Sequence, residues 1–429
     1  MIGFAGLSHL GVVSAIATAA KGFEVLAYDG DASLCESLNR GQISFFEPEL
    51  EKLLKVNQSR IRFVADAAAL TQCDVIYFSR DVATDDQGRS NLSPLTDLIE
   101  RVVPSAAMGA TLVILSQVPP GFTRRLAKKV GQSFADRQLQ VCYQVETLIF
   151  GRAVERALYP ERFIIGAADG RRALPRAFTE LLAAFTCPIL TMRYESAELA
   201  KISINMCLVS SVSVANTMAE LCERIGADWS EIVPALKLDK RIGPHAYLSP
   251  GLGIAGGNLE RDLATVVALA NEFGADDGVV DSWISNSRYR RDWVLQQMHQ
   301  QVLSRIQNPL IAIWGLAYKQ DTDSTRNSPA LFLIEALKPF RIQAYDPSVK
   351  LDRVSAANLR QTESALDACA GADVLAIMTP WKEFSDISLD DIKVSMKGRS
   401  IIDPYGTLNG DACIEAEFSY FKLGSGDCE

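Results

Sequence analysis

A lysine and an asparagine lie four residues apart in the stretch SAELAKISINM (196–206). If this stretch is helical, Lys201 and Asn205 project from the same face of the helix. A cation and an amide directed at one point can stabilise a developing alkoxide or hold a water molecule. The alternative is an ordinary lysine on a solvated helix face beside a polar neighbour. The spacing therefore indicates a candidate catalytic pair that other elements must complete.

A second candidate stretch is GLGIAGGNLERD (251–262), whose first seven residues include four glycines. Glycine lets the backbone approach another group very closely. Asn258 follows the glycines at the point where a helical pattern begins, and its side chain is not a nucleophile. Asp262 lies four residues further on. An aspartate at a helix start commonly caps the helix, but this carboxylate can also accept a proton, directly or through water.

The third candidate is the motif GLSHLG at residues 6–11, between a predicted strand and a predicted helix. The first glycine would make a tight turn, the last would let helix and strand pack closely, and the helix N-terminus would face a pyrophosphate. The middle glycine of the usual pattern is a serine here. A carboxylate at the end of the second strand would accept a hydrogen bond from a ribose 2′-OH and repel a 2′-phosphate, which favours NAD over NADP. The predicted cofactor contacts here are Gly6, Ser8, His9, Leu10, Gly11 and Asp29. The alternative is a Rossmann sheet that no longer binds a nucleotide.

The elements around these motifs alternate between strands and helices. Apolar strand patterns occupy residues 2–6, 24–29, 73–79 and 111–116, with helical patterns between them, which predicts a parallel doubly wound sheet. Residues 194–226 contain no proline and no internal glycine before position 226, so we expect one long, mostly buried helix. The chain stays helical to about residue 297, apart from a loop at 239–258.

From residue 309 the strand pattern recurs: LIAIWG resembles IGFAG, and IQAYD (342–346) resembles VLAYD (25–29). The predicted fold class is α/β, with two Rossmann-like doubly wound parallel-sheet domains joined by a long central helix and a helical dimerisation region. The predicted domains are an NAD-binding domain at 1–192, a central helical and dimerisation domain at 193–297, and a C-terminal nucleotide-sugar-binding α/β domain at 298–429.

Composition narrows the function classes. The 429 residues carry a net charge of −9 without a long basic run, which argues against nucleic-acid binding. The nine cysteines form no CxxC pair and the three histidines share no motif, so we expect no metal site. The apolar N-terminus lacks a positively charged leader, and no unbroken apolar run of membrane-spanning length occurs. We therefore expect a cytoplasmic protein without a membrane partner.

Several stretches together resemble the UDP-glucose/GDP-mannose dehydrogenase family. They run in the family's order over nearly the whole chain: GQISFFEPELEKLL (41–54), VPPGFT (118–123), YPERFIIG (159–166), SAELAKISINM (196–206), DKRIGPHAYLSPGLGIAGG (239–257), GLAYKQDTDSTRNSPAL (315–331) and TPWKEF (379–384). The family oxidises the C6 alcohol of a nucleotide sugar to a carboxylate with two NAD. The resemblance implies an NAD cofactor, a nucleotide-sugar substrate, with UDP-glucose the commonest, and a homodimer.

The resemblance also implies roles for single residues. In the family, the residues matching Lys201, Asn205 and Asp262 position a water molecule. Arg241 matches an arginine that reaches the substrate across the dimer, and its planar fork suits hydroxyls or a phosphate. Further substrate contacts are expected at Tyr247, Gly256, Lys319 and Tyr405. Further cofactor contacts are expected at Gln117, Arg261 and Arg326.

Departures from the family pattern cluster at site positions. The family's nucleophilic cysteine, which attacks the aldehyde intermediate, corresponds to Asn258, and an amide cannot form that adduct. Of two family glutamates, Glu146 remains as a predicted catalytic residue and the second is Phe150. A threonine is replaced by Gln117 and an arginine by Tyr405. The proline-containing turn after the third strand is RDVAT (80–84), without proline.

Three interpretations remain open. The protein could perform only the first oxidation, from alcohol to aldehyde, because Lys201, Asn205 and Asp262 are present. It could complete the four-electron oxidation without a thioester, by direct attack of water; Cys142 and Cys207 neighbour site motifs, but nothing places either thiol on the glycine loop. It could also be a non-catalytic paralogue that binds a nucleotide sugar or regulates an active homologue.

Overall fold

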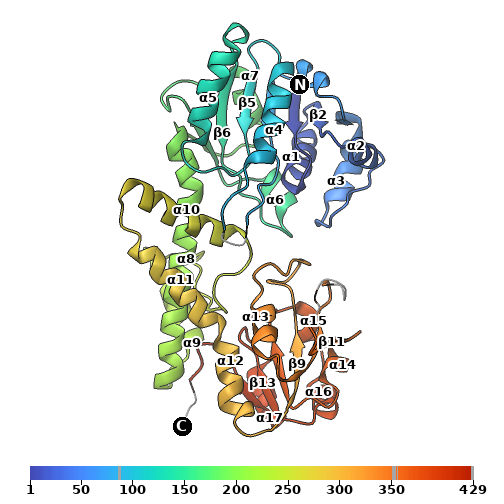
Figure 1. Ribbon diagram of the computed structural model, residues 1–429, viewed down its shortest axis with the longest axis vertical. Helices are drawn as coiled ribbons and strands as arrows, with labels where there is room; N and C mark the ends of the chain where they lie inside the picture. The colour runs from blue at the N-terminus through green and yellow to red at the C-terminus, as the bar shows by residue number, and fades with distance from the viewer. Residues whose placement is uncertain (86–87, 350–353, 355, 427–429) are drawn as a thin grey trace. The chain divides into compact units, whose positions relative to one another are not determined.

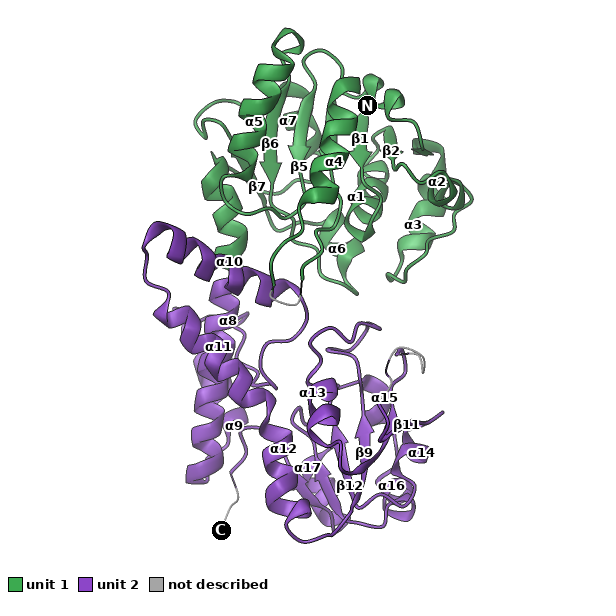
Figure 2. Ribbon diagram, in the orientation of Figure 1, with its two compact units in different colours: residues 1–204 green, residues 205–429 purple. Residues whose placement is uncertain are grey.

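The structure is a computed structural model that describes residues 1–85, 88–349, 354 and 356–426. The chain forms two compact units, Met1–Ile204 and Asn205–Glu429 (Figure 2). The division falls inside one long helix, α8 (Tyr194–Ile225), which begins in the first unit and ends in the second. The finer division at residues 192 and 297 remains a prediction.

The first unit is built on an eight-stranded sheet with the order β3-β2-β1-β4-β5-β6-β7-β8 (Figure 1). Its strands are β1 (Ile2–Ala5), β2 (Val25–Tyr28), β3 (Ile61–Val64), β4 (Val75–Phe78), β5 (Thr111–Ile114), β6 (Gln140–Gln144), β7 (Phe163–Ala167) and β8 (Ile189–Arg193). All neighbouring strands are parallel except β6 and β7, which pair antiparallel. The central strands are buried on both faces, as their unbroken apolar sequences require.

Helices cover both faces of this sheet. They are α1 (His9–Ala20), α2 (Ala32–Asn39), α3 (Leu50–Asn57), α4 (Ser93–Val102), α5 (Phe122–Ser133), α6 (Ala153–Leu158) and α7 (Arg176–Ala183), with 3-10 turns at Gln58–Arg60, Ala67–Gln72, Val103–Ser105 and Ala135–Arg137. Successive residues of a strand pack into two separate hydrophobic cores. Phe4 packs in the core that contains α1, and Ala5 packs in the core that contains α4. This alternation follows from the two-residue period of a strand.

The helical part of the second unit follows α8. It contains α9 (Trp229–Leu238), α10 (Asn258–Phe273), α11 (Gly278–Arg291) and α12 (Trp293–Met298), and a π-helical turn at His299–Leu303. The prediction of one long helix is confirmed within a residue at its end, but the prediction that it is mostly buried is wrong. One face of α8 carries exposed apolar side chains, at Leu199, Val214, Met218, Leu221 and Ile225. Among the described residues, α8 is long and apolar enough to pass a membrane-span test of length and composition.

A second, fully parallel sheet has the order β11-β10-β9-β12-β13-β14. Its strands are β9 (Leu310–Trp314), β10 (Arg341–Tyr345), β11 (Leu359–Gln361), β12 (Val374–Ile377), β13 (Ser400–Ile402) and β14 (Ser419–Phe421). Its helices are α13 (Pro329–Ala336), α14 (Ala365–Cys369), α15 (Lys382–Ser385), α16 (Leu389–Ser395) and α17 (Gly410–Glu415). The predicted α/β class with two Rossmann-like sheets is confirmed.

The predicted similarity between the N-terminal and C-terminal α/β halves includes individual hydrogen bonds. The Gly6 amide donates to the Tyr28 carbonyl over 2.9 Å, and the Gly315 amide donates to the Tyr345 carbonyl over 2.8 Å. In both halves an aspartate after the second strand accepts a hydrogen bond from the backbone amide that follows this glycine. Asp29 accepts from Leu7, and Asp346 accepts from Leu316. Asp346 additionally accepts from Trp381 Nε1 and from three other backbone amides, so this carboxylate is part of the folded core of the second half.

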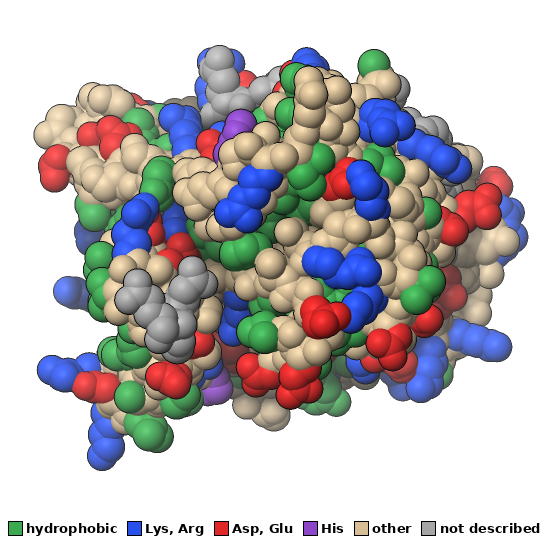
Figure 3. Space-filling view, turned by 90° about the horizontal axis from the view of Figure 1, so that it is seen from below, with side chains coloured by type: hydrophobic (Ala, Val, Ile, Leu, Met, Phe, Trp, Pro, Cys, Tyr) green, Lys and Arg blue, Asp and Glu red, His purple; other side chains and the backbone are tan. Residues whose placement is uncertain are grey.

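Acidic and basic side chains are interspersed on the face drawn in Figure 3. An anionic ligand at such a surface is held by individual cations near the site rather than by a broad positive field.

Candidate active site

The loop after β1 is shaped by its two outer glycines. Gly6 has φ +92°, a left-handed conformation that a residue with a side chain rarely adopts. A Cβ atom on Gly11 would lie 1.9 Å from the carbonyl oxygen of Gly6, so only glycine fits where α1 crosses the loop. The tight turn and the close helix–strand packing expected from the sequence are therefore both present.

The loop at residues 6–11, together with Asp29, can bind the ribose and the pyrophosphate of a dinucleotide. Asp29 lies beside the loop because its Oδ2 accepts from the Leu7 amide at 2.9 Å, and its Oδ1 accepts from the Asp31 amide at 3.1 Å. The N-terminus of the twelve-residue helix α1 faces the same loop. These are a carboxylate that can take a ribose hydroxyl and a helix end that attracts phosphate. NAD would be held here by the amides of the loop and by Asp29.

Ser8 holds a segment that the sequence prediction did not connect to the loop. The Ser8 hydroxyl donates to the Ser79 carbonyl at 3.3 Å and accepts from the Asp81 amide at 2.8 Å. Asp81 Oδ2 in turn accepts from the amide of Leu10 at 3.3 Å, in the first turn of α1. The missing signal was spatial: residues 79–81 follow β4, which pairs with β1.

His9, the first residue of α1, lies between two phenylalanine rings. Its ring centroid is 4.9 Å from that of Phe45 and 4.4 Å from that of Phe150. Its Nε2 is 3.0 Å from Oε2 of Glu47, a buried carboxylate that also accepts from the backbone amides of Gly151 and Ala153. Phe150, at a position where the resemblance expects a glutamate, thus packs against His9 beside the cofactor loop. Sequence reasoning missed Glu47, although it lies in the matched stretch 41–54.

Lys201 and Glu146 form an ion pair in the first unit. The Nζ and Oε2 atoms are 3.8 Å apart, and both side chains are largely buried. Glu146 also accepts from the Leu148 amide through its other oxygen. This pair brings together two residues that the sequence predicted as catalytic from stretches more than fifty residues apart. Gln117, a predicted cofactor contact, follows β5 of the same sheet and is half-buried.

Asn205 and Asp262 form a second contact, in the second unit. Asn205 Nδ2 donates to Asp262 Oδ2 over 2.5 Å, and only 1% of Asp262 is exposed. The neighbouring side chain of Arg261 is also buried, with its Nε 3.4 Å from Asp262 Oδ1. Asp262 was expected to be able to cap its helix, and that expectation is wrong, because α10 begins four residues earlier at Asn258. The carboxylate is instead fixed between an amide and a guanidinium.

The glycine loop before α10 is tightly bounded. Gly253 has φ +74°, and a Cβ there would lie 2.3 Å from the Ser287 carbonyl oxygen; Gly256 has φ +83°, and a Cβ there would lie 2.8 Å from the ring of Tyr318. A Cβ on Gly257 would lie 3.1 Å from Nε of Arg326. Asn258 follows this loop as the first residue of α10, one residue before the start that the sequence predicted.

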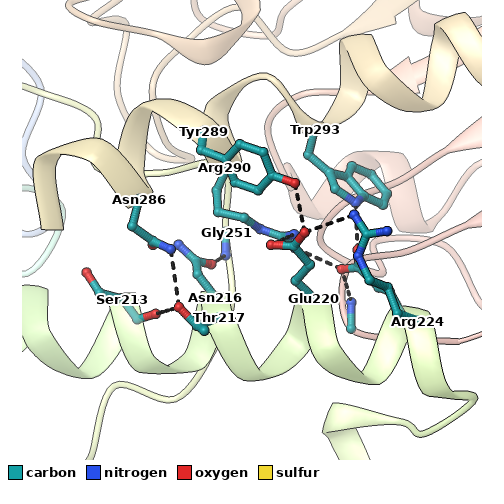
Figure 4. Close-up of polar contacts among 12 residues, drawn as sticks. Ser213, Asn216, Thr217, Glu220, Arg224, Gly251, Asn286, Tyr289, Arg290 and Trp293 are labelled. Atoms are coloured by element: carbon teal, nitrogen blue, oxygen red, sulfur yellow. Dashed lines mark hydrogen bonds and ion pairs between the residues drawn. The ribbon is translucent and has the colours of Figure 1, made fainter. Parts of the chain in front are cut away.

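Two side chains anchor the start of the same loop. Asn216, on α8, is buried and accepts from the Gly251 amide through Oδ1 at 2.8 Å (Figure 4). Ser287, on α11, accepts from the Ile254 amide through Oγ at 2.7 Å. Sequence reasoning missed both residues, because neither lies in a motif and only the packing of α8 and α11 brings them to the loop.

The predicted substrate contacts of the second unit occupy different environments. Tyr405 packs against the glycine loop, with its Cε1 4.0 Å from a Cβ position on Gly251, and burial together with the charge of Asp403 raises the pKa of Tyr405. The Lys319 ammonium is 5.8 Å from the centre of the Tyr318 ring. Arg241 is 89% exposed and makes a two-pronged contact with Asp239 at 3.0 and 2.7 Å. Tyr247 is exposed as well.

The cysteines near site motifs are separate from the glycine loop. Cys142 is buried on β6, and burial raises the pKa of its thiol to about 12, which makes it a poor nucleophile. Cys207 is exposed on α8. Within the described ranges, no group of three or more His, Cys, Asp or Glu side chains is arranged to hold a metal ion.

Three domain models of one family match the chain in order. The NAD binding domain of the UDP-glucose/GDP-mannose dehydrogenase family matches residues 1–186, its central domain matches 195–288, and its UDP binding domain matches 312–410. The first match contains the Gly6–Gly11 loop, and the second contains Asn205 and Asp262. The cofactor is therefore NAD.

Whole-chain relatives agree. A UDP-glucose 6-dehydrogenase of Rickettsia typhi is 28% identical over 99% of both chains. The structure of a UDP-glucose dehydrogenase from Pyrobaculum islandicum is 25% identical, with a TM-score of 0.84 over 99% of this chain and 98% of that one. The structure of a UDP-D-ManNAc dehydrogenase from Pyrococcus horikoshii is also 25% identical, with a TM-score of 0.84 over the whole of both chains. The chain belongs to the UDP-glucose/GDP-mannose dehydrogenase family and is an NAD-dependent nucleotide-sugar dehydrogenase.

Proposed function

We propose that this dehydrogenase oxidises the C6 alcohol of a UDP-sugar once and releases the aldehyde. The observation that carries the proposal is the contrast between two positions on α10. Asp262 is a buried carboxylate, held by a hydrogen bond from Asn205, that can accept a proton, whereas Asn258 offers an amide where the resemblance expects a thiolate. The side chains for the first step are thus present, and the nucleophile for the second step is replaced.

The roles of the residues in the first step follow from their chemistry. Asp262 accepts the hydroxyl proton, directly or through water, because it is a carboxylate held by an amide. Lys201 and Asn205, one turn apart on α8, stabilise the negative charge that develops on the substrate oxygen. Glu146 orients the Lys201 ammonium through their 3.8 Å ion pair. NAD supplies the hydride acceptor when bound.

The second oxidation differs because it requires addition to the aldehyde carbon. An amide nitrogen is not a nucleophile at neutral pH, so Asn258 cannot form the covalent adduct from which a second hydride would leave. Cys142 cannot substitute, since its thiol is buried in β6. Direct attack of water remains the chemical alternative, and it would double the NADH formed per sugar.

The substrate proposed is a UDP-sugar, because the relatives are named for UDP-glucose and UDP-D-ManNAc. The test is to incubate the purified chain with NAD and each of these sugars, and to count NADH formed per sugar consumed. One NADH per sugar, with an aldehyde trapped by a hydrazine, supports the proposal. Two NADH per sugar, with an acid product, contradicts it.

A binding function without turnover is the second candidate, and Phe150 favours it. Its ring packs at a tilt against His9 beside the cofactor loop, at a position where the resemblance expects a glutamate. Retained sugar binding measured by calorimetry, with no NADH formed from any sugar in the panel, would support this candidate over the first.

We also propose that the chain acts as a homodimer in the cytoplasm. The exposed apolar side chains of α8 resemble an interface that is buried by a partner, and the eight described cysteines are free, as in a reducing compartment. Val214→Glu with Leu221→Glu should yield monomers in sedimentation velocity, whereas Val394→Glu, at another exposed apolar position, should not. Monomeric wild type would contradict the assembly, and recovery of the native protein outside the cytoplasmic fraction would contradict the location.

A further inference from the structure

We propose that Asp81 competes with the pyrophosphate of NAD for the N-terminus of α1 and so sets the affinity for the cofactor. The inference rests on NAD as the cofactor of the proposed function. It goes beyond that function because it assigns a role to a residue outside the predicted site. All the residues involved belong to the first unit.

The position of the carboxylate carries the argument. Asp81 Oδ2 accepts from the Leu10 amide at 3.3 Å, and this amide lies in the first turn of α1. Amides of this turn have no partner within their own helix, and the helix dipole attracts an anion to them. They are the groups that hold a pyrophosphate in a dinucleotide fold. The Asp81 carboxylate of the chain itself therefore already occupies part of the phosphate-binding end of α1.

Ser8 makes this arrangement possible. Serine is a preferred N-cap residue, but the Ser8 side chain makes no capping bond to α1. Its hydroxyl accepts instead from the Asp81 amide at 2.8 Å and donates to the Ser79 carbonyl at 3.3 Å. A glycine at position 8 would lack this hydroxyl. Ser8, which stands where the usual dinucleotide pattern has a glycine, thus contacts Asp81 in the segment after β4.

The contact can be broken without unfolding the unit. Asp81 is exposed to solvent and lies after the end of β4, so its side chain can rotate into water. The Asp81 carboxylate and the pyrophosphate of NAD are both negatively charged. They would repel each other if both were bound to the amides of the same helix turn. Binding of NAD therefore requires the carboxylate to leave the Leu10 amide.

The test measures NAD binding rather than turnover. Isothermal titration calorimetry with NAD alone is run on the full chain and on Asp81→Asn, which keeps the side-chain shape and removes its charge. We expect the variant to bind NAD about two- to tenfold more tightly, the range of a charge effect at a helix end. The gain should shrink as salt is raised, because exposed charges are screened. Asp97→Asn, which removes an exposed charge on α4 of the same unit, should leave the affinity unchanged.

A double-mutant comparison shows whether the effect of Asp81 depends on its contact with Ser8 or is a general effect of its charge. In a Ser8→Ala background the Asp81 amide loses its hydroxyl partner, so Asp81→Asn should bring a smaller gain than in the wild type. Equal or weaker NAD binding by Asp81→Asn would overturn the inference and leave the proposed function intact. Absence of NAD binding by the wild type and all variants would overturn the inference and the cofactor assignment together. A thermal melt of each variant confirms that it is folded.

Discussion

The amide of Asn205 donates a 2.5 Å hydrogen bond to the carboxylate of Asp262, and both side chains are buried. A carboxylate held in this way has one orientation, so a substrate hydroxyl meets it in a fixed geometry. The contact joins α8 to α10, the helix that also begins with Asn258. In the proposed function, one helix thus carries both the proposed base, Asp262, and Asn258, where the resemblance expects a nucleophile.

Asp262→Asn should lower the rate of NADH formation by about 10²- to 10⁴-fold, the usual contribution of a general base. NAD affinity should stay within about twofold of the wild-type value, since the change is isosteric and lies outside the cofactor loop. Asp281→Asn, which changes an exposed carboxylate on α11, is the matched control and should keep the wild-type rate. A rate for Asp262→Asn close to that of the control would exclude Asp262 as the base.

Asn258→Cys should restore part of the second oxidation. The residue is the first of α10, where the helix dipole lowers the pKa of a thiol and favours the reactive thiolate. We expect a carboxylate product by mass spectrometry and more than one NADH per sugar. Asn258→Ser introduces a side chain that is similar in size to cysteine but is a weak nucleophile, so this variant should release aldehyde only. If Asn258→Cys makes aldehyde but no acid, the cysteine is not the only missing group.

Gly256→Ala should destabilise the protein more than Gly274→Ala. Both glycines have a left-handed conformation, with φ +83° and +68°, but a Cβ on Gly256 would lie 2.8 Å from the Tyr318 ring, whereas none of the described atoms lies within 4 Å of one on Gly274. Conformation alone costs about 1–2 kcal/mol in each variant, and the clash adds about 1–3 kcal/mol for Gly256. Urea unfolding of the two variants measures the difference. Equal losses would show that Tyr318 does not confine the loop.

Glu195→Gln should reduce stability at neutral pH but not in strong acid. Hydrogen bonds from Arg124, at 2.8 and 2.9 Å, lower the pKa of Glu195 from 4.5 to about 2. A carboxyl whose pKa is lowered by folding stabilises the native state above pH 4.5, and this contribution is lost as the pH falls towards 2. Both side chains are partly exposed, so the effect should stay below about 1 kcal/mol. Thermal melts of wild type and variant should converge on acidification; a constant gap from pH 7 to pH 3 would contradict the assignment.

The sequence was sufficient to predict the two α/β sheets and the long helix. Unbroken apolar strands such as Val25–Tyr28 and Val374–Ile377 are typical of sheets that are buried on both faces, and both lie in that setting. The reversed direction of β7 was not predictable, because strand direction depends on the path of the chain between strands. The exposed stripe on α8 was missed because small and apolar residues surround the whole helix, so its sequence shows no clear polar face.

The site was predictable where its residues lie in motifs and not where it depends on packing. Asn205 was predicted together with Asp262, and the two are in contact. Asn216 and Ser287, which anchor the glycine loop, lie in helices without any motif. The contact of Asp81 with α1 was equally invisible, since it depends on β4 lying beside β1. The catalytic and binding roles of all the predicted site residues stay predictions, including those of Arg241 and Tyr247, whose side chains are exposed.

The most direct test of the account is the number of NADH molecules formed per UDP-sugar consumed by the wild-type protein. The experiment uses limiting UDP-glucose, excess NAD and a hydrazine trap, and quantifies sugar, aldehyde and acid in the same sample. The account predicts one NADH per sugar and a trapped aldehyde, because Asp262 is in place and Asn258 cannot form a thioester. Two NADH per sugar with an acid product would contradict it.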